Sequence, residues 1–227
     1  MREIPVVTKN LIAINVLMFL ALLAFERSGI DLNNLLGLHL FLAPDFHPYQ
    51  LVTYMFMHGG FTHILFNMYA VWIFGSILER VWGSSRFLLY YIITGVGAGI
   101  VQEAVQYIYY TMNLAQYTQV NYIGQIISMS EYLNLWTTVG ASGAVYGILL
   151  AFAMTFPNEK LFMIPFPFPI KAKYFVLIFG ALELFTGLSN NASDNVAHFA
   201  HLGGMIFGII MILYWRKKGK IDGPYNY

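Results

Sequence analysis

The sequence predicts an all-α, polytopic membrane protein with six transmembrane helices. Of its 227 residues, 58% are hydrophobic and 10% are charged, whereas roughly 25% are charged in a soluble domain. Crossing about 30 Å of hydrocarbon takes about 20 mostly apolar helical residues. Six stretches approach this length, and each is expected to be a helix because a backbone in lipid must satisfy its own hydrogen bonds. They are 10–25, 61–80, 86–105, 140–156, 173–189 and 196–215.

The basic residues predict the orientation of these spans. If the N-terminus is cytoplasmic, only Arg27 of the 12 Lys and Arg residues lies outside, which is a strong positive-inside pattern. Both termini are then cytoplasmic, and spans two, four and six run from outside to inside. The residues placed inside are Arg2, Lys9, Arg80, Arg86, Lys160, Lys171, Lys173, Arg216, Lys217, Lys218 and Lys220.

Composition excludes several classes of function. The chain has no cysteine, which removes disulfides, thiol nucleophiles and cysteine-based metal or redox sites. A net charge of +1 gives no reason to expect a nucleic-acid partner. We expect one domain over residues 1–227. The apolar stretch that follows Pro5 and ends near Phe25 has no small-residue cleavage site, so we interpret it as a retained helix and not as a signal peptide.

The connecting segments differ in character. The outer loop 26–57 holds few charges and many apolar residues, and we expect part of it to lie in the membrane interface. The outer loop 106–138 is rich in Tyr, Gln and Asn, and the sequence assigns it no role. Within the loop 157–172, four prolines end span four and separate it from span five; they are Pro157, Pro165, Pro167 and Pro169.

Ionisable side chains within membrane spans are costly and often functional, and four of those in the predicted spans are His63, Glu183, His198 and His201. His63 and Asn67 share one face of span two, where packing between helices would by itself be the favoured explanation. His58 precedes the span and is expected to cap it or to brace the outer loop. For Glu183 we expect a protonated carboxyl or a hydrogen bond to an adjacent helix.

Spans three, four and six carry small residues at four-residue spacing, which allow close helix contacts. The pairs are Gly95 and Gly99, Gly143 and Gly147, and Gly204 and Gly208. If spans four and six meet through their glycines, Ser142 and His201 both lie near the outer end of that contact. His198 and His201 alone are a weak metal pattern, and the chain has no His-Glu-x-x-His motif of a zinc protease.

Ser142 opens span four, which is about 17 residues or roughly 25 Å long and therefore shorter than the hydrocarbon core. Its outer end is expected to lie below the outer surface, at the level of His201. A serine hydroxyl with a histidine base suits acyl transfer. No carboxylate is placed as a third member, since Asp194 lies roughly 10 Å along the helix from His201. The pattern predicts a Ser-His dyad, with Tyr146 stacked on the imidazole.

An oxyanion formed at Ser142 requires hydrogen-bond donors. The backbone N–H of Ser142, the imidazole of His63 and the amide of Asn67 are expected to supply them. The dipole of a helix N-terminus favours negative charge at the same place.

Four motifs, in order along the chain, resemble those of the rhomboid intramembrane serine proteases in their basic six-helix, bacterial-type form. His58, His63 and Asn67 fit the span-two pattern, and Glu79-x-x-x-Gly83-x-x-x-Phe87 resembles the turn after it. Gly140-Ala141-Ser142-Gly143 is similar to the Gly-x-Ser-Gly motif, and Ala200-His201-x-x-Gly204-x-x-x-Gly208 to the Ala-His-x-x-Gly-x-x-x-Gly motif. Where this family usually has Trp-Arg or Trp-Gln in the first outer loop, the chain has Tyr49-Gln50.

The resemblance implies Ser142 as nucleophile, His201 as general base, and His63 with Asn67 as the oxyanion site. Spacing to Gly204 selects His201 over His198, which is expected to be a supporting or oxyanion-side residue. The expected activity is cleavage of transmembrane segments of other proteins near the outer leaflet, without a metal or organic cofactor.

The expected location is multi-pass in a bacterial plasma (inner) membrane, and the sequence does not define the oligomeric state. One alternative is a catalytically silent rhomboid-like protein that binds membrane clients. A channel or transporter is disfavoured because the polar groups lie on one side and the spans show no inverted repeat.

Overall fold

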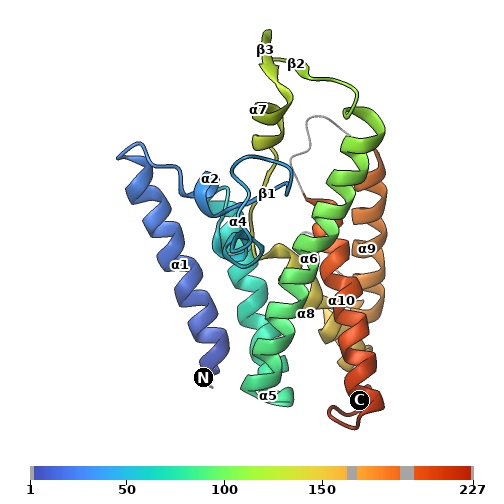
Figure 1. Ribbon diagram of the computed structural model, residues 1–227. Helices are drawn as coiled ribbons and strands as arrows, with labels where there is room; N and C mark the ends of the chain where they lie inside the picture. The colour runs from blue at the N-terminus through green and yellow to red at the C-terminus, as the bar shows by residue number, and fades with distance from the viewer. Residues whose placement is uncertain (1–2, 163–167, 190–196, 226–227) are drawn as a thin grey trace.

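The computed structural model describes residues 3–162, 168–189 and 197–225, which form a bundle of membrane-length helices (Figure 1). Among the described residues, five helical stretches are long and apolar enough to cross a membrane. They are α1 (Val6–Glu26), the continuous stretch Phe61–Trp82, α6 (Ser84–Asn113), α9 (Ala172–Ser189) and α10 (His198–Lys217). The predicted fourth span, which completes the six, is the shorter helix α8 (Ser142–Thr155). The described residues do not include Arg2, Pro165, Pro167, Asp194 or Val196, the first residue of the predicted span 196–215.

Span two is a single helical stretch with an irregular middle. It comprises α4 (Phe61–Ala70), the π-helical turn η2 (Val71–Gly75) and α5 (Ser76–Trp82). The carboxylate of Glu79 connects its inner end to two neighbouring helices. This carboxylate accepts hydrogen bonds from the backbone N–H of Val7 at 2.9 Å, from the N–H of Thr8 at 2.7 Å and from Ser84 Oγ at 2.6 Å. The start of α1 and the start of α6 are thereby both bound to the inner end of span two.

The predicted interfacial loop after α1 is built from short elements. They are α2 (Leu32–Leu36), β1 (Leu38–His39), α3 (Gln50–Thr53) and the single turn η1 (Tyr54–Phe56). Gln50 organises this loop: its Oε1 accepts from the N–H of His39 at 3.3 Å and of His47 at 3.1 Å, and its Nε2 donates to Asp45 O at 2.9 Å. Strand β1 pairs with β4 (Thr137–Thr138), directly before the segment that leads to Ser142.

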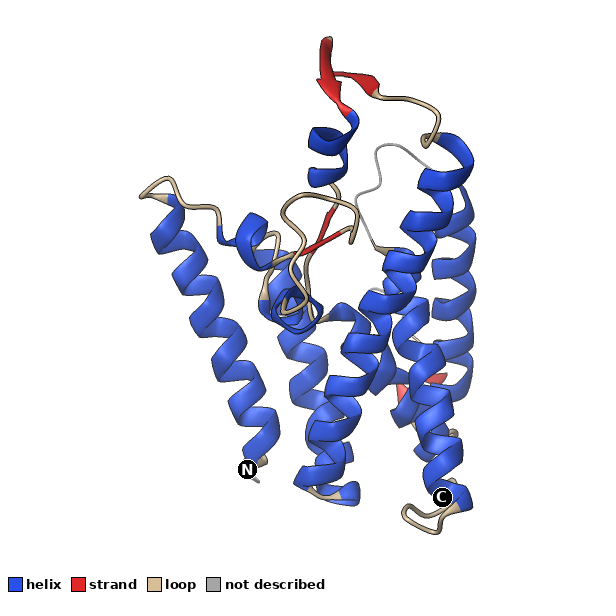
Figure 2. Cartoon of the chain, viewed as in Figure 1, coloured by secondary structure: helices blue, strands red, loops and turns tan. Residues whose placement is uncertain are grey.

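The second outer loop is shorter than expected because α6 continues to Asn113, beyond the predicted end at residue 105. Its 30 residues extend about 45 Å, which exceeds the hydrocarbon core. A hydropathy pattern predicts only the apolar part of α6, because a helix can continue beyond the apolar residues into water. The loop then forms the hairpin of β2 (Gln119–Tyr122) and β3 (Gln125–Ser128) and the helix α7 (Met129–Asn134), which starts with a Ser128–Glu131 capping box. Figure 2 shows this hairpin protruding from the bundle.

Glycines set the closest helix contacts. A Cβ placed on Gly204 of α10 would lie 1.9 Å from the carbonyl oxygen of Gly143 on α8, so these helices meet as predicted. Gly147 faces Thr94 of α6 instead, and Gly208 faces the hydroxyl of Tyr90. The expectation for span three is corrected, because its two glycines do not receive a helix. Gly95 and Gly99 accommodate the side chains of Met55 and Tyr54 from η1.

The inner end of α8 is held at the level of the basic end of α10. Arg216 Nη2 donates to Met154 O at 2.7 Å, and the N–H of Tyr225 donates to Thr155 O at 2.8 Å. The following loop pairs β5 (Lys160–Leu161) with β6 (Ile170–Lys171) before α9 begins.

Candidate active site

Ser142 is the first residue of α8, at the outer end of a short buried helix. The chain reaches it through Gly140, whose φ of +130° is rarely adopted by residues with a side chain. The N–H of Gly140 donates to Tyr54 O at 2.9 Å, which attaches this segment to the outer loop. The backbone N–H groups of the first helical turn have no partner within the helix, so Ser142 lies beside donors available to an anion.

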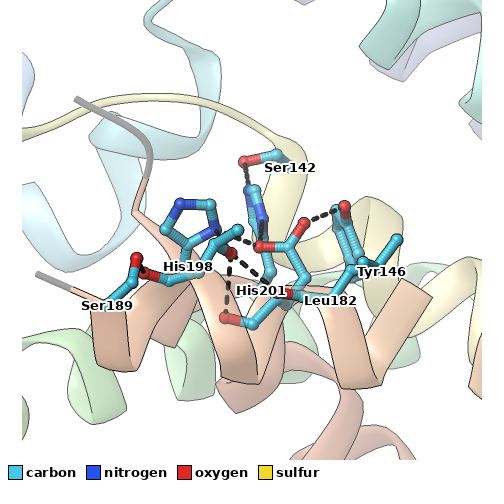
Figure 3. A network of polar contacts seen from close by, with 8 residues as sticks. Ser142, Tyr146, Leu182, Ser189, His198 and His201 are labelled. Carbon is cyan, nitrogen blue, oxygen red and sulfur yellow. Dashed lines mark hydrogen bonds and ion pairs between the residues drawn. The ribbon is translucent and has the colours of Figure 1, made fainter. Parts of the chain in front are cut away.

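His201 of α10 faces Ser142. Its Nε2 lies 2.8 Å from Ser142 Oγ, and its residue surface is 7% exposed. The ring of Tyr146, one turn further along α8, stacks on the imidazole with a centroid distance of 4.2 Å and an interplanar angle of 8°. The helix crossing at Gly143 and Gly204 therefore brings together the serine, the histidine and the stacking ring (Figure 3).

A carboxylate completes this group, so the prediction that none lies near His201 is wrong. Oε2 of Glu183, on α9, lies 2.9 Å from His201 Nδ1. The imidazole nitrogen is not aligned on that oxygen as in a regular hydrogen bond, so the contact is mainly electrostatic. Oε1 of Glu183 accepts a hydrogen bond from the hydroxyl of Tyr146. The sequence predicts that Glu183 is either protonated or hydrogen-bonded to an adjacent helix. In the structure its carboxyl contacts Tyr146 of α8 and His201 of α10.

His198 lies on the α9 side of the site. Its Nδ1 is 2.5 Å from Glu183 Oε2 and 3.1 Å from Thr186 Oγ1. These contacts make His198 a neighbour of the carboxylate and do not place it with the predicted oxyanion donors. His198 and His201 thus approach the same oxygen from successive turns of α10.

His63 approaches the site from the opposite side. A Cβ on Gly140 would lie 2.8 Å from His63 Nε2 and 3.5 Å from Ser142 Oγ, so the imidazole borders the space in front of the serine. Asn67 is buried and donates its Nδ2 to His63 O at 2.9 Å. In this arrangement the amide supports the helix backbone at His63.

His58 lies behind His63 and packs its ring edge-on at a centroid distance of 5.0 Å. It does not cap α4, whose N-cap is Gly60 without a side-chain hydrogen bond. Its carbonyl accepts from Asn33 Nδ2 at 3.4 Å, a contact with the outer loop. Burial lowers the pKa of His58 to about 4, and the nearby His63 adds to this effect.

The length of α8 sets the depth of Ser142. Its 14 residues rise about 21 Å, against about 30 Å for the hydrocarbon core. The helix is therefore about 9 Å shorter than that core, and its last turn is bound to Arg216 in the basic last turn of α10.

Among the described residues, Glu183, His198 and His201 form the group that could hold a metal, with donor atoms within 4.8 Å of one another. Zinc bonds of about 2.0–2.1 Å place tetrahedral ligand atoms about 3.3 Å apart. The separations of 2.5 and 2.9 Å at Glu183 Oε2 are shorter and correspond to contacts between donors and an acceptor.

This fold and site define a class of membrane protein, and sequence comparison identifies it. The rhomboid domain family matches residues 45–218, and the chain belongs to the rhomboid family. It is 28% identical to the putative rhomboid protease YdcA of Bacillus subtilis over 75% of this chain and 68% of that protein. It is 32% identical to the rhomboid protease AarA of Providencia stuartii over 70% of this chain and 53% of that protein.

A third relative is named as a rhomboid-like protein, without the word protease. The chloroplastic rhomboid-like protein 11 of Arabidopsis thaliana is 27% identical over 91% of this chain and 64% of its own length. The chain thus spans between about half and two thirds of the length of these three relatives.

Sequence reasoning missed two residues. Glu183 occupies the buried face of α9, seven residues after the buried Val176, while Leu182 and Leu184 beside it are exposed. The sequence carries no sign of this periodicity, because Val176, Leu182 and Leu184 are all apolar and no polar–apolar pattern marks the buried face of α9. In the sequence, Gln50 stands out only as part of a departure from a motif, whereas in the structure its side chain connects His39, Asp45 and His47 of the outer loop.

Proposed function

We propose that this rhomboid-family protein is an intramembrane serine endopeptidase that cleaves transmembrane segments near the outer leaflet. The observation that carries the proposal is the 2.8 Å contact between Ser142 Oγ and His201 Nε2. This contact lies at the predicted outer end of a helix that is shorter than the hydrocarbon core. A serine hydroxyl is a weak nucleophile without a base, and a neutral imidazole within hydrogen-bond distance supplies that base.

In this mechanism, Ser142 Oγ attacks the scissile carbonyl and its proton passes to His201 Nε2. The carbonyl oxygen becomes an oxyanion, for which the Ser142 backbone N–H and the imidazole of His63 are the nearest candidate donors. His201 then gives the proton to the leaving amine, which breaks the peptide bond and leaves an acyl ester on Ser142. Water hydrolyses this ester with the same histidine as base.

The shallow position of Ser142 favours substrates that can unwind near the outer surface. A peptide carbonyl within a helix is hydrogen-bonded and screened by the helix, so it must be released before attack. We therefore expect cleavage next to glycine or other helix-weak residues. The orientation with both termini in the cytoplasm, and residence in a bacterial plasma membrane, belong to the same proposal.

The test uses the purified full chain in liposomes with a single-span fusion protein that carries a glycine pair near the outer end of its span. Cleavage is expected for the wild type and is expected to fall at least about a hundredfold, the lower range for loss of a general base, in Ser142→Ala and His201→Ala. Retained cleavage in Ser142→Ala would overturn the serine mechanism. Loss in His198→Ala with full activity in His201→Ala would show that His198 is the base.

A serine-directed fluorophosphonate distinguishes the enzyme from a silent binding protein, because it needs no protein substrate. Reaction forms a bond between Ser142 Oγ and phosphorus, releases fluoride and transfers the hydroxyl proton to the base. We expect a mass increase on the peptide that contains Ser142, dependent on His201. A folded wild-type protein that is not labelled would contradict the proposal and favour the binding protein.

A further inference from the structure

Glu183 is a buried carboxylate on a helix that is otherwise largely exposed. Glu183 itself is 8% exposed, whereas Leu182, Leu184 and Phe185 are 53%, 47% and 73% exposed. A carboxyl group placed inside the membrane is costly and requires compensating partners. Its position therefore needs an explanation beyond the packing of α9.

Within the described part of the chain, each side chain that contacts the Glu183 carboxyl can donate a hydrogen. Tyr146 of α8 donates to Oε1, and His198 and His201 of α10 approach Oε2 at 2.5 and 2.9 Å. An ionised carboxylate only accepts hydrogen bonds, so this set suits its charged form. Two of the three partners, Tyr146 and His201, also contact each other as stacked rings.

The histidine lies between the serine and the carboxylate. When Nε2 of His201 accepts the hydrogen of Ser142 Oγ, Nδ1 carries the ring hydrogen, and Nδ1 is the nitrogen that faces Glu183. The carboxylate favours this tautomer and opposes the positive charge that appears on the ring after proton transfer. A carboxylate whose only role was to hold α9 in place would not need to contact Nδ1 of His201.

We infer that Glu183 is a positioning residue that orients His201 and stabilises its protonated form, so that the Ser142–His201 pair acts with a third, acidic member. This inference rests on the proposed serine mechanism. Its effect is expected to be smaller than the roughly 10⁴-fold loss caused by removing the acid of a serine protease triad. The reason is that the carboxylate is close to Nδ1 but not in line with it.

The test measures fluorophosphonate labelling of Ser142 as a function of pH, on the purified full chain in detergent. For Glu183→Gln we expect labelling to slow at least about tenfold. We also expect the acidic limb of the pH–rate profile to move to lower pH, because a neutral amide no longer stabilises the imidazolium. Tyr146→Phe keeps a ring for stacking and removes one donor to Glu183, so we expect an intermediate rate.

Other titratable groups face the site and need controls. His198 shares the carboxylate oxygen, and His63 borders Gly140 from α4. The shift caused by Glu183→Gln should persist in a His198→Gln background. Glu103→Gln is the matched control, since Glu103 is equally buried but accepts from the N–H of Phe41 in the outer loop, and we expect it to leave the profile unchanged.

The outcomes distinguish failure of the role inferred for Glu183 from failure of the proposed serine mechanism. If the wild type is not labelled, the serine mechanism itself fails. If labelling requires Ser142 and His201 but Glu183→Gln reacts at the wild-type rate, only the role of Glu183 is refuted. If Glu183→Gln lowers the melting temperature and the rate while the acidic limb stays in place, Glu183 is a structural clasp and the inference is overturned.

Discussion

Gly140 illustrates how a single residue shapes the proposed oxyanion side of the site. Its φ of +130° is unfavourable for any residue with a Cβ, and a Cβ there would lie 2.7 Å from His63 Cε1. A side chain at this position therefore strains the backbone and displaces an imidazole at the same time.

Gly140→Ala should lower proteolysis and fluorophosphonate labelling at least about tenfold, because strained backbone costs about 1–3 kcal/mol. Gly60→Ala is the control, since Gly60 has an extended backbone and no atom within 4 Å of an added Cβ. Equal activity of the two variants would mean that the segment before Ser142 adapts freely.

His58 makes stability depend on pH. It is 1% exposed, and burial lowers its pKa from 6.5 to about 4. A histidine with a lowered pKa in the folded state stabilises the fold above the unfolded value, and this contribution is lost as pH falls through the window from 6.5 towards 4.

Between pH 8 and pH 5 the loss from His58 should be about 2 kcal/mol of unfolding free energy. Denaturation of the wild type and of His58→Gln in the same detergent measures it. The variant should lose less stability on acidification, by about that amount. Parallel pH curves for the two proteins would assign the acid sensitivity to other groups.

At the scale of elements, the crossing of α8 and α10 holds Ser142 and His201 in register. The contact point is Gly204 against the backbone of Gly143, where no flexible side chain can move aside. Serine and histidine are 59 residues apart in sequence, and this crossing brings their atoms within hydrogen-bond distance.

Gly204→Ala should destabilise the protein by about 1–3 kcal/mol, as overpacking does, and should abolish labelling of Ser142. Gly180→Ala is the comparison, because an added Cβ there meets only Met205 Cε at 3.2 Å, the end of a flexible side chain. A melting temperature for Gly204→Ala equal to that of Gly180→Ala would show that the two helices can separate without cost.

How much of this arrangement the sequence predicts depends on the range of the interaction. Hydropathy locates the spans, because helix in a membrane is a local property of the chain. The pairing of Ser142 with His201 was predictable from glycine spacing and motif order. The contact of Glu183 was not, because it depends on how α9 is rotated about its axis. The hydrogen bonds of Gln50 depend on loop closure, which has no periodic signal.

At the scale of the whole molecule, the positive-inside pattern predicts that the site opens to the side opposite the termini. In Figure 1 the two labelled termini lie at one end of the bundle and the β2–β3 hairpin at the other. Ser28 follows the end of α1 and Gln125 begins β3, and both are exposed. Lys160 and Lys220 are exposed in the segments predicted to be cytoplasmic.

Because the chain has no cysteine, single substitutions can report this orientation without background. In intact bacterial cells, a membrane-impermeant maleimide should label Ser28→Cys and Gln125→Cys. Lys160→Cys and Lys220→Cys should react only after permeabilisation. Since Ser142 lies at the outer end of α8 while Arg216 binds the inner end, this pattern would place the nucleophile in the outer half of the membrane. Labelling of Lys160→Cys and Lys220→Cys in intact cells, with Ser28→Cys protected, would invert the topology and place cleavage near the cytoplasmic leaflet.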